Sequence, residues 1–245
     1  MDELIRYIAQ YDPAFPGTVR GASADEIARL EPLAGRPLPR SYRAFLATMG
    51  HGLGTFDPFP DGMVVSIEEL ISLYESEPPL YPERYLLIGV DYGGYRMDLF
   101  LETLRPETEP RVVRFNRETE LVTPDMMSLQ AESLPELLFS MAFYSVRMSR
   151  LPWQARLVPS EEALPPPEAA RRMEEYARTA ARLGFARFPY TGPWSPCYDR
   201  ADAALYCYQP PPCDPSFTVA AMAERECNLL AEVLCDALRL HRIRL

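Results

Sequence analysis

The sequence predicts an α+β protein, in which a mostly antiparallel sheet is flanked by helices and followed by a C-terminal α-β-β-α extension. Short apolar, β-branched segments alternate with turn residues, which is typical of strands. The connections between them are short, as in the hairpin-type segment 106–110, and this favours antiparallel pairing. Amphipathic segments with capping residues indicate helices before and after the strands. We expect strands near 63–65, 85–90, 97–101 and 111–115.

The helices of the first part are predicted from their capping residues. Ser23 and Glu26 have the spacing of a capping box at a helix start. Gly35 suits the left-handed position after that helix, and Pro39 suits the first turn of the next one. Ser66 is a second cap with a glutamate three residues later. We expect helices over 2–11, 24–34, 39–49, 66–75 and 133–148.

A proline-rich segment divides the sequence into two parts. Residues 151–167 contain five prolines, a composition that predicts a boundary or an extended belt. We therefore expect one domain over 1–150, and an extension or small second domain over 151–245.

Within the extension, the pattern predicts helix, strand, strand and helix. Residues 168–183 form an amphipathic helix, with ion pairs Glu168–Arg172 and Glu174–Arg178 at helical spacing. Strands are expected at 185–190 and 203–208. Asp214–Pro215 predicts the start of the last helix, because aspartate is a good cap and proline suits the first turn. Its apolar stripe consists of Val219, Met222, Ala223, Cys227, Leu230, Leu234 and Leu238.

An ordered series of short motifs resembles the SUKH superfamily. The first four pieces form a helix, a tight break, a second helix and a glycine stop, and the later pieces are similar to the family's strands and closing helix. Residues 22–145 carry the resemblance. The motifs are 27–31, 35–39, 42–46, 50–52, 88–94, 112–115 and 134–138.

This resemblance implies a protein-binding role without catalysis. The superfamily contains bacterial immunity proteins against polymorphic toxins and fungal regulators of cell-wall synthesis. The expected function is therefore immunity, in which the protein binds and occludes a polymorphic or contact-delivered toxin. The alternative is an intracellular regulatory or scaffold module that binds other proteins. An enzyme of unknown type is a third possibility, which the residue inventory disfavours.

The composition excludes several enzyme classes. All 25 basic residues are arginine, so the lysine of a P-loop, of a protein kinase or of a pyridoxal-phosphate enzyme is missing. His51 and His241 are the only histidines, and they are too far apart in the sequence to form an H-E-x-x-H zinc site. We expect no enzymatic activity and no cofactor.

All five cysteines lie in the last 49 residues, and none forms a C-x-x-C pair. We expect reduced, mostly buried thiols without a metal. A mixed metal site is the minor alternative, with the ligands Cys197, Cys207, Cys213 and His241. The N-terminus lacks the features of a signal peptide and no apolar run is long enough to span a bilayer, so the expected location is the cytoplasm.

Negative charge is concentrated in residues 51–109. The net charge of the chain is −10, and this segment holds 12 acidic residues against 3 arginines. Such a balance disfavours nucleic-acid binding and favours a basic protein partner, for example a toxin nuclease. We expect the acids to converge on one face and to contact that partner. The expected contact residues are Asp57, Asp61, Glu68, Glu69, Glu75, Asp91, Tyr92, Asp98 and Glu102.

Two alternatives explain the same acids without a partner. A solvated acidic surface that serves only solubility accounts for the charge equally well. Asp91, next to Gly93 and Gly94, resembles a catalytic or metal-binding carboxylate. A turn aspartate that binds its own backbone amides is the better explanation of this position.

Overall fold

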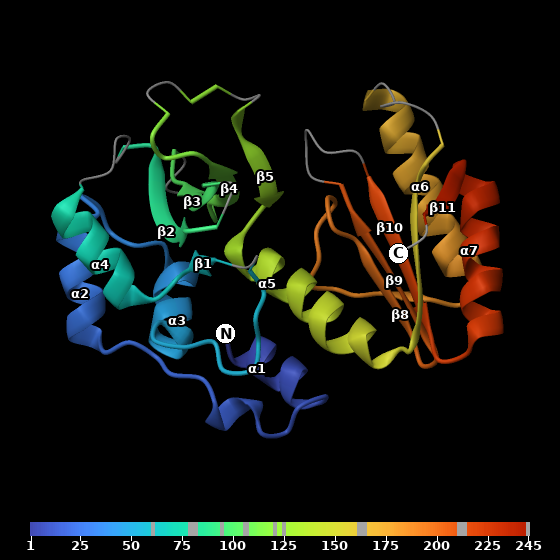
Figure 1. Cartoon of the computed structure of the whole chain (residues 1–245), viewed down its shortest axis with the longest axis horizontal. Coiled ribbons are helices and arrows are strands. Elements are labelled where there is room, and N and C mark those ends of the chain that lie inside the picture. The colour runs from blue at the N-terminus through green and yellow to red at the C-terminus, as the bar shows by residue number, and fades with distance from the viewer. Residues whose placement is uncertain are drawn as a thin grey trace. The chain divides into compact units, whose positions relative to one another are not determined.

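The protein forms two compact units, Met1–Ala142 and Phe143–Leu245, which are described separately (Figure 1). A computed structural model describes both of them. The residues described are 1–59, 62–77, 83–93, 96–104, 108–119, 122–123, 126–160, 166–209 and 215–243, with side chains from 170 onward in the helix that begins at 166.

The first unit contains a five-stranded antiparallel sheet in which neighbours in sequence pair with one another. The predicted α+β class is confirmed, and the strands expected at four places are present. A fifth strand was not expected. The strands are β1 (Met63–Val64), β2 (Tyr85–Asp91), β3 (Asp98–Glu102), β4 (Arg111–Phe115) and β5 (Ser128–Ala131).

Helices flank this sheet, and their ends follow the capping residues. Ser23 and Glu26 form the expected capping box. Ser66 accepts the Glu69 backbone N–H, and Gly35 has a φ of +67°. Pro39 is the N-cap of its helix rather than a residue of the first turn. The helical elements are α1 (Asp2–Ala9), the 3-10 turn η1 (Phe15–Gly17), α2 (Ala24–Leu33), α3 (Arg40–Met49), α4 (Ile67–Ser76) and α5 (Leu134–Ala142).

The central strands of the first sheet are buried along almost their whole length. Every residue of β2 is buried, as expected when both faces of a strand are covered. Phe100 and Phe115 stack at a centroid distance of 3.9 Å on paired strands, and the Tyr85 ring meets both. This rigid centre holds the ends of β2 and β3, where the candidate site lies.

The second unit contains a six-stranded antiparallel sheet in the order β11-β6-β10-β9-β8-β7. It begins with a π-helical turn, η3 (Phe143–Arg147), and a 3-10 turn, η4 (Met148–Arg150). Its helices are α6 (Pro166–Arg182) and α7 (Glu224–Leu238). Its strands are β6 (Trp153–Pro159), β7 (Ala186–Arg187), β8 (Cys197–Arg200), β9 (Ala203–Tyr208), β10 (Ser216–Ala221) and β11 (Leu240–Ile243).

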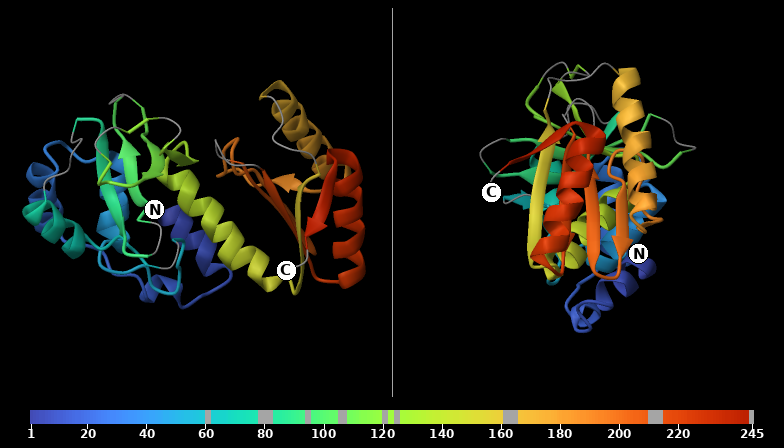
Figure 2. Two further views of the ribbon diagram at one scale, coloured as in Figure 1. Left: turned by 45° about the horizontal axis from the view of Figure 1, so that its top comes forward. Right: turned by 90° about the vertical axis from the view of Figure 1, so that its right-hand side faces the viewer.

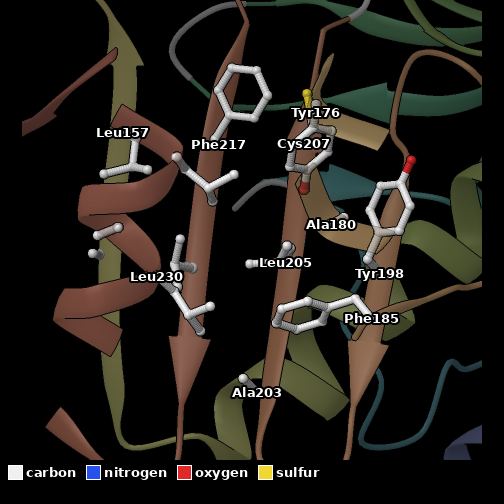
Figure 3. Close-up of a cluster of buried hydrophobic side chains, with 14 of the residues drawn as sticks. Leu157, Tyr176, Ala180, Phe185, Tyr198, Ala203, Leu205, Cys207, Phe217 and Leu230 are labelled. Carbon is white, nitrogen blue, oxygen red and sulfur yellow. The ribbon is translucent and has the colours of Figure 1, made fainter. Parts of the chain in front are cut away.

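The order β6-α6-β9-β10-α7-β11 is the split β-α-β arrangement of ferredoxin-like folds, with the β7–β8 hairpin inserted after α6. Both helices cover one face of the sheet, as the right-hand view of Figure 2 shows. Figure 3 shows the core between them, where Tyr176 and Ala180 from α6 and Leu230 from α7 meet strand residues such as Phe217 and Leu205. This unit therefore has a hydrophobic core of its own.

The predicted α-β-β-α arrangement of this half is wrong. Residues 153–159, expected in a proline-rich belt, form β6, and 216–221, expected in the last helix, form β10. The last helix begins only at Glu224. Phe217, Val219 and Ala221 alternate into the core, and this period of two identifies a strand.

Two further expectations for this half concern its helical ion pairs and its cysteines. Arg178 pairs with Glu175 at 2.8 Å, whereas the expected partner was Glu174, and the Glu168 side chain lies outside the described residues. Four cysteines carry thiols, three of them buried and Cys235 half-buried; Cys213 lies outside the described residues. Burial raises the pKa of the Cys207 thiol well above its usual range.

Candidate functional site

The first turn of α4 presents two glutamates beside α2. Glu68 and Glu69 follow the N-cap Ser66, where negative charge is stabilised by the helix dipole. The Glu68 side chain is 61% exposed, and Glu69 is half-buried. Helix α2 packs against α4 and brings Glu26 to the same side. Carboxylates from two helices therefore gather at one end of the helix pair.

His51 lies between these carboxylates. Its Nε2 is 3.0 Å from Glu26 Oε2, and its Nδ1 contacts Glu68 Oε1. The pKa of Glu26 is lowered to about 2, first by the hydrogen bonds from Ser23 and then by the one from His51. The pKa of His51 is raised, mainly by its hydrogen bond to Glu26 and then by Glu68, against an opposing effect of burial.

Tyr92 extends this acidic end towards the sheet. It follows β2 directly, and its backbone N–H donates to Gly62 O at 2.9 Å. Its hydroxyl donates to Glu69 Oε1, a hydrogen bond that raises the pKa of the phenol. The side chain is 57% exposed. A held but accessible aromatic ring of this kind is a common anchor for a protein partner.

A surface hollow of about 220 Å³ adjoins Tyr92. It lies where β2 ends, β3 begins and β4 ends, so three strands supply its walls. Its lining residues include both acids and arginines, together with Tyr92 and Gly93. The lining residues are Asp91, Tyr92, Gly93, Arg96, Asp98, Asn116, Arg117 and Glu118.

Asp91 and Asp98, both expected at the partner surface, are structural residues of this hollow. They are 6% and 2% exposed. Asp91 accepts the backbone N–H groups of Gly93 and Met97 at 2.8 and 3.0 Å and pairs with Arg114 at 3.0 Å. Asp91 therefore acts as the turn aspartate of the alternative interpretation.

Asp98 closes the same turn from the neighbouring strand. It accepts the Asp91 backbone N–H at 2.8 Å and lies 3.4 Å from Arg117. Burial raises its pKa, against the opposing effects of this hydrogen bond and of Arg117. Both carboxylates are therefore buried within their own turn, unlike the exposed contact residues that the sequence led us to expect.

The remaining predicted contact residues are only partly brought together. Glu75 pairs with Arg29 on the α2–α4 side. Glu102 pairs with Arg84 at the far end of β3, about 14 Å along the strand from Asp98. Asp57 is exposed, and Asp61 lies outside the described residues.

We define the acidic surface as five exposed or half-exposed glutamates from α2, from α4 and from the residue that follows α4. Hydrogen bonds link Glu26 and Glu68 through His51, and Glu69 to Tyr92, whereas Glu75 and Glu77 each pair with a separate arginine. Its basic groups, Arg29 and Arg117, neutralise part of the charge; Arg117 is 4.0 Å from Glu77. Sequence reasoning expected three of its acids. The acidic surface consists of Glu26, Glu68, Glu69, Glu75 and Glu77, with His51 and Tyr92 between them.

The comparison with known proteins gives one family match. Residues 21–140 match the SMI1/KNR4 family (SUKH-1). The segment is a SUKH domain. No curated protein and no solved structure matches the chain.

The SUKH domain contains α2 to α5 and all five strands of the first sheet, so the acidic surface and the hollow lie entirely within it. The second unit lies outside the matched segment. Glu26 of the SUKH domain was missed as a site residue because it precedes the acidic segment 51–109. Its only signal in the sequence is the capping box with Ser23.

His51 is the only histidine in the sequence of the SUKH domain. Both ring nitrogens of His51 face carboxylates, so neither is directed at a serine or cysteine nucleophile. Among the residues described, no group of three or more histidine, cysteine, aspartate or glutamate side chains is placed to hold a metal ion. In the same residues, no helix has the length and apolar character needed to cross a bilayer.

Proposed function

We propose that this chain is a non-enzymatic immunity protein, whose SUKH domain binds a cationic protein toxin through its acidic surface and occludes it. The observation that carries the proposal is the set of five exposed or half-exposed glutamates on α2, on α4 and directly after α4, with the exposed Tyr92 bound to one of them, within one SUKH domain. Membership of the family supports a protein partner, and the charge supports a basic one.

The proposed mechanism needs no bond chemistry from the inhibitor. Long-range attraction between opposite charges speeds the encounter and selects against acidic partners. Tyr92 then supplies apolar contact area beside the charged groups, as aromatic residues do at the centre of interfaces. A toxin that acts on nucleic acid carries a cationic face for its substrate, and an acidic inhibitor complements that face.

A regulatory or scaffold role is the second candidate. The observation that favours it is the second unit, which has its own sheet and core outside the matched family segment. A scaffold would use this unit to hold a further partner. An immunity protein would need only the SUKH domain for occlusion, so deletion or disruption of the second unit would leave toxin binding intact.

The test is the association rate with a toxin encoded beside this gene or recovered with the protein from its host. The triple variant Glu68→Gln, Glu69→Gln, Glu77→Gln removes three charges from the acidic surface but keeps the side-chain sizes. We expect association several-fold slower at low salt, and a difference that shrinks at high salt because the Debye length falls from about 8 Å at physiological strength to about 3 Å at 1 M.

The matched control removes the same charge from α7 in the second unit. The exposed Glu224, Glu232 and Asp236 are changed to Gln, Gln and Asn. The proposal requires this control to associate almost as fast as the wild type. Equal association rates for the acidic-surface variant and the control at low salt would contradict the proposal. The acidic surface would then serve only solubility.

A further inference from the structure

The two hydrogen-bond contacts of the His51 ring favour one of its protonation states. A carboxylate accepts hydrogen bonds but donates none, and a neutral imidazole has a single N–H. Nδ1 faces Glu68 and Nε2 faces Glu26, so both contacts are hydrogen bonds only when both nitrogens carry a proton. The arrangement therefore fits the imidazolium form of His51.

The backbone holds His51 at this position between two helices. Its N–H donates to Arg20 O at 2.9 Å, and the preceding Gly50 O accepts the Ile67 N–H at 2.8 Å at the start of α4. The side chain is 21% exposed, so solvent can deliver and remove its proton. Glu26 lies in the first turn of α2 and Glu68 in the first turn of α4. The protonated His51 side chain thus links the first turn of α2 to the first turn of α4.

We propose that Glu26, His51 and Glu68 form a proton-operated strap, which ties the first turns of α2 and α4 together and opens when His51 loses a proton. Opening removes one of the two hydrogen bonds and one positive charge, so the net charge of the acidic surface becomes more negative by one. The effect of that charge on partner binding rests on the proposed function, whereas the strap itself does not.

The pH range of the strap follows from its charged groups. Glu26 and Glu68 face His51 from the two helices, Ser23 Oγ contacts Glu26, and Arg20 lies on the segment that pairs with Gly52. Arginine stays protonated throughout. Because the pKa of His51 is raised from 6.5, the strap's contribution to stability is complete below pH 6.5 and is lost as the pH rises through the raised value.

At low pH the stability contribution changes in the opposite direction, because it then depends on Glu26. The pKa of Glu26 is lowered from 4.5 to about 2, so its contribution is complete above pH 4.5 and is lost as the pH falls towards 2. Between about pH 4.5 and pH 6.5 the strap therefore makes its full contribution to stability.

The test is an NMR titration of the full chain, in which the imidazole nitrogen signals distinguish the imidazolium from the neutral forms. The protein has only two histidines, so the single variants His51→Gln and His241→Gln assign both sets of signals. We expect both His51 nitrogens to be protonated at pH 6 and the midpoint to lie above 6.5. The double variant Glu26→Gln, Glu68→Gln should lower that midpoint.

The matched controls separate the strap from general charge effects. Gln at position 26 is compatible with the capping box, so the start of α2 is preserved. Glu75→Gln removes a charge from the same helix α4 without touching His51, and should leave the midpoint nearly unchanged. Amide exchange in the first turns of α2 and α4, compared with the His51→Gln variant at each pH, should show protection that is lost above the midpoint.

A His51 midpoint at or below 6.5, or one that the double variant does not move, would overturn the proposal. Equal shifts from Glu75→Gln and from the double variant would also overturn it, because the effect would then be general electrostatics. No partner is used in these measurements, so their failure is separate from a failure of the proposed function.

Discussion

Asp91→Ala is expected to lower the free energy of unfolding of the first unit by about 3–5 kcal/mol, the range for removing one member of a buried ion pair. The Asp91 side chain is 4% exposed and its partner Arg114 is 17% exposed, so the arginine would be left with little solvent to replace the carboxylate. The Gly93 and Met97 amides would also lose their acceptor. Asp91→Asn keeps one oxygen and should cost less, about 2–3 kcal/mol.

The assay uses urea denaturation of the full chain with two signals. Both tryptophans, Trp153 and Trp194, belong to the second unit, so tryptophan fluorescence follows the unfolding of that unit. Amide exchange of β2 and β3 follows the first unit. We expect Asp91→Ala to move the unfolding of the first unit, followed through the amides of β2 and β3, to a lower urea concentration. The fluorescence transition of the second unit should stay almost unchanged.

Asp57→Ala is the matched control, since Asp57 is exposed and belongs to the same unit. It should change the free energy of unfolding by no more than about 0.5 kcal/mol. A loss below about 1 kcal/mol for Asp91→Ala would refute the reasoning, because the carboxylate would then not be needed to compensate the buried guanidinium and amides.

Three further outcomes are expected. Tyr176→Phe should leave the stability of the second unit unchanged or raise it by up to about 1 kcal/mol, because the buried hydroxyl has no hydrogen-bond partner in the described residues; a clear loss in the fluorescence-monitored urea transition would contradict this. Arg147→Gln should destabilise the same unit by about 2–3 kcal/mol in that assay, since Arg147 is buried and donates to Asp199 at 3.0 Å and to Arg200 O at 2.8 Å; an unchanged transition would disprove it. Toxin association at low salt should become faster as the pH rises through the titration of His51, and His51→Gln should flatten that profile in stopped-flow measurements; parallel profiles would exclude a role of this proton in binding.

The helix starts of the first unit were predictable because their signals are local. The Ser23–Glu26 capping box and the Ser66 cap each lie within four residues, and their hydrogen bonds form inside one helical turn. Gly35 ends α2 for an equally local reason, its positive φ. Such elements are set by neighbours in sequence, so tertiary packing does not override them.

The strands of the second unit were not predictable in the same way. Val219 and Met222 match helical spacing with the residues that follow, yet Met222 is 56% exposed and Val219 is buried in a strand. In β6, Pro159 lies at the strand end, and the strand is recognisable only from its pairing with β10 and β11. The partners of β6 lie more than 50 residues away in sequence, and local composition carries little trace of such pairing.

The candidate contact residues were chosen from the distribution of acidic residues in the sequence. That distribution does not indicate which side chains are buried. Counting acids placed Glu68 and Glu69 correctly on an accessible helix start, but it could not separate them from Asp91 and Asp98, which are enclosed by their own turn. Glu26 was missed because it is distant in sequence and joins the others only through His51.

The helical stretch at 134–150 limits how this chain can be cut or recombined. Elements α5, η3 and η4 follow one another without a gap, and the division between the two units falls between Ala142 and Phe143. A fragment that starts at the proline-rich segment would lack Phe143, whose ring lies 5.2 Å from Phe188, and Arg147, which binds Asp199. A gene fusion or truncation that preserves both cores therefore has to be joined within the helical run, and not at the prolines that mark the apparent boundary in the sequence.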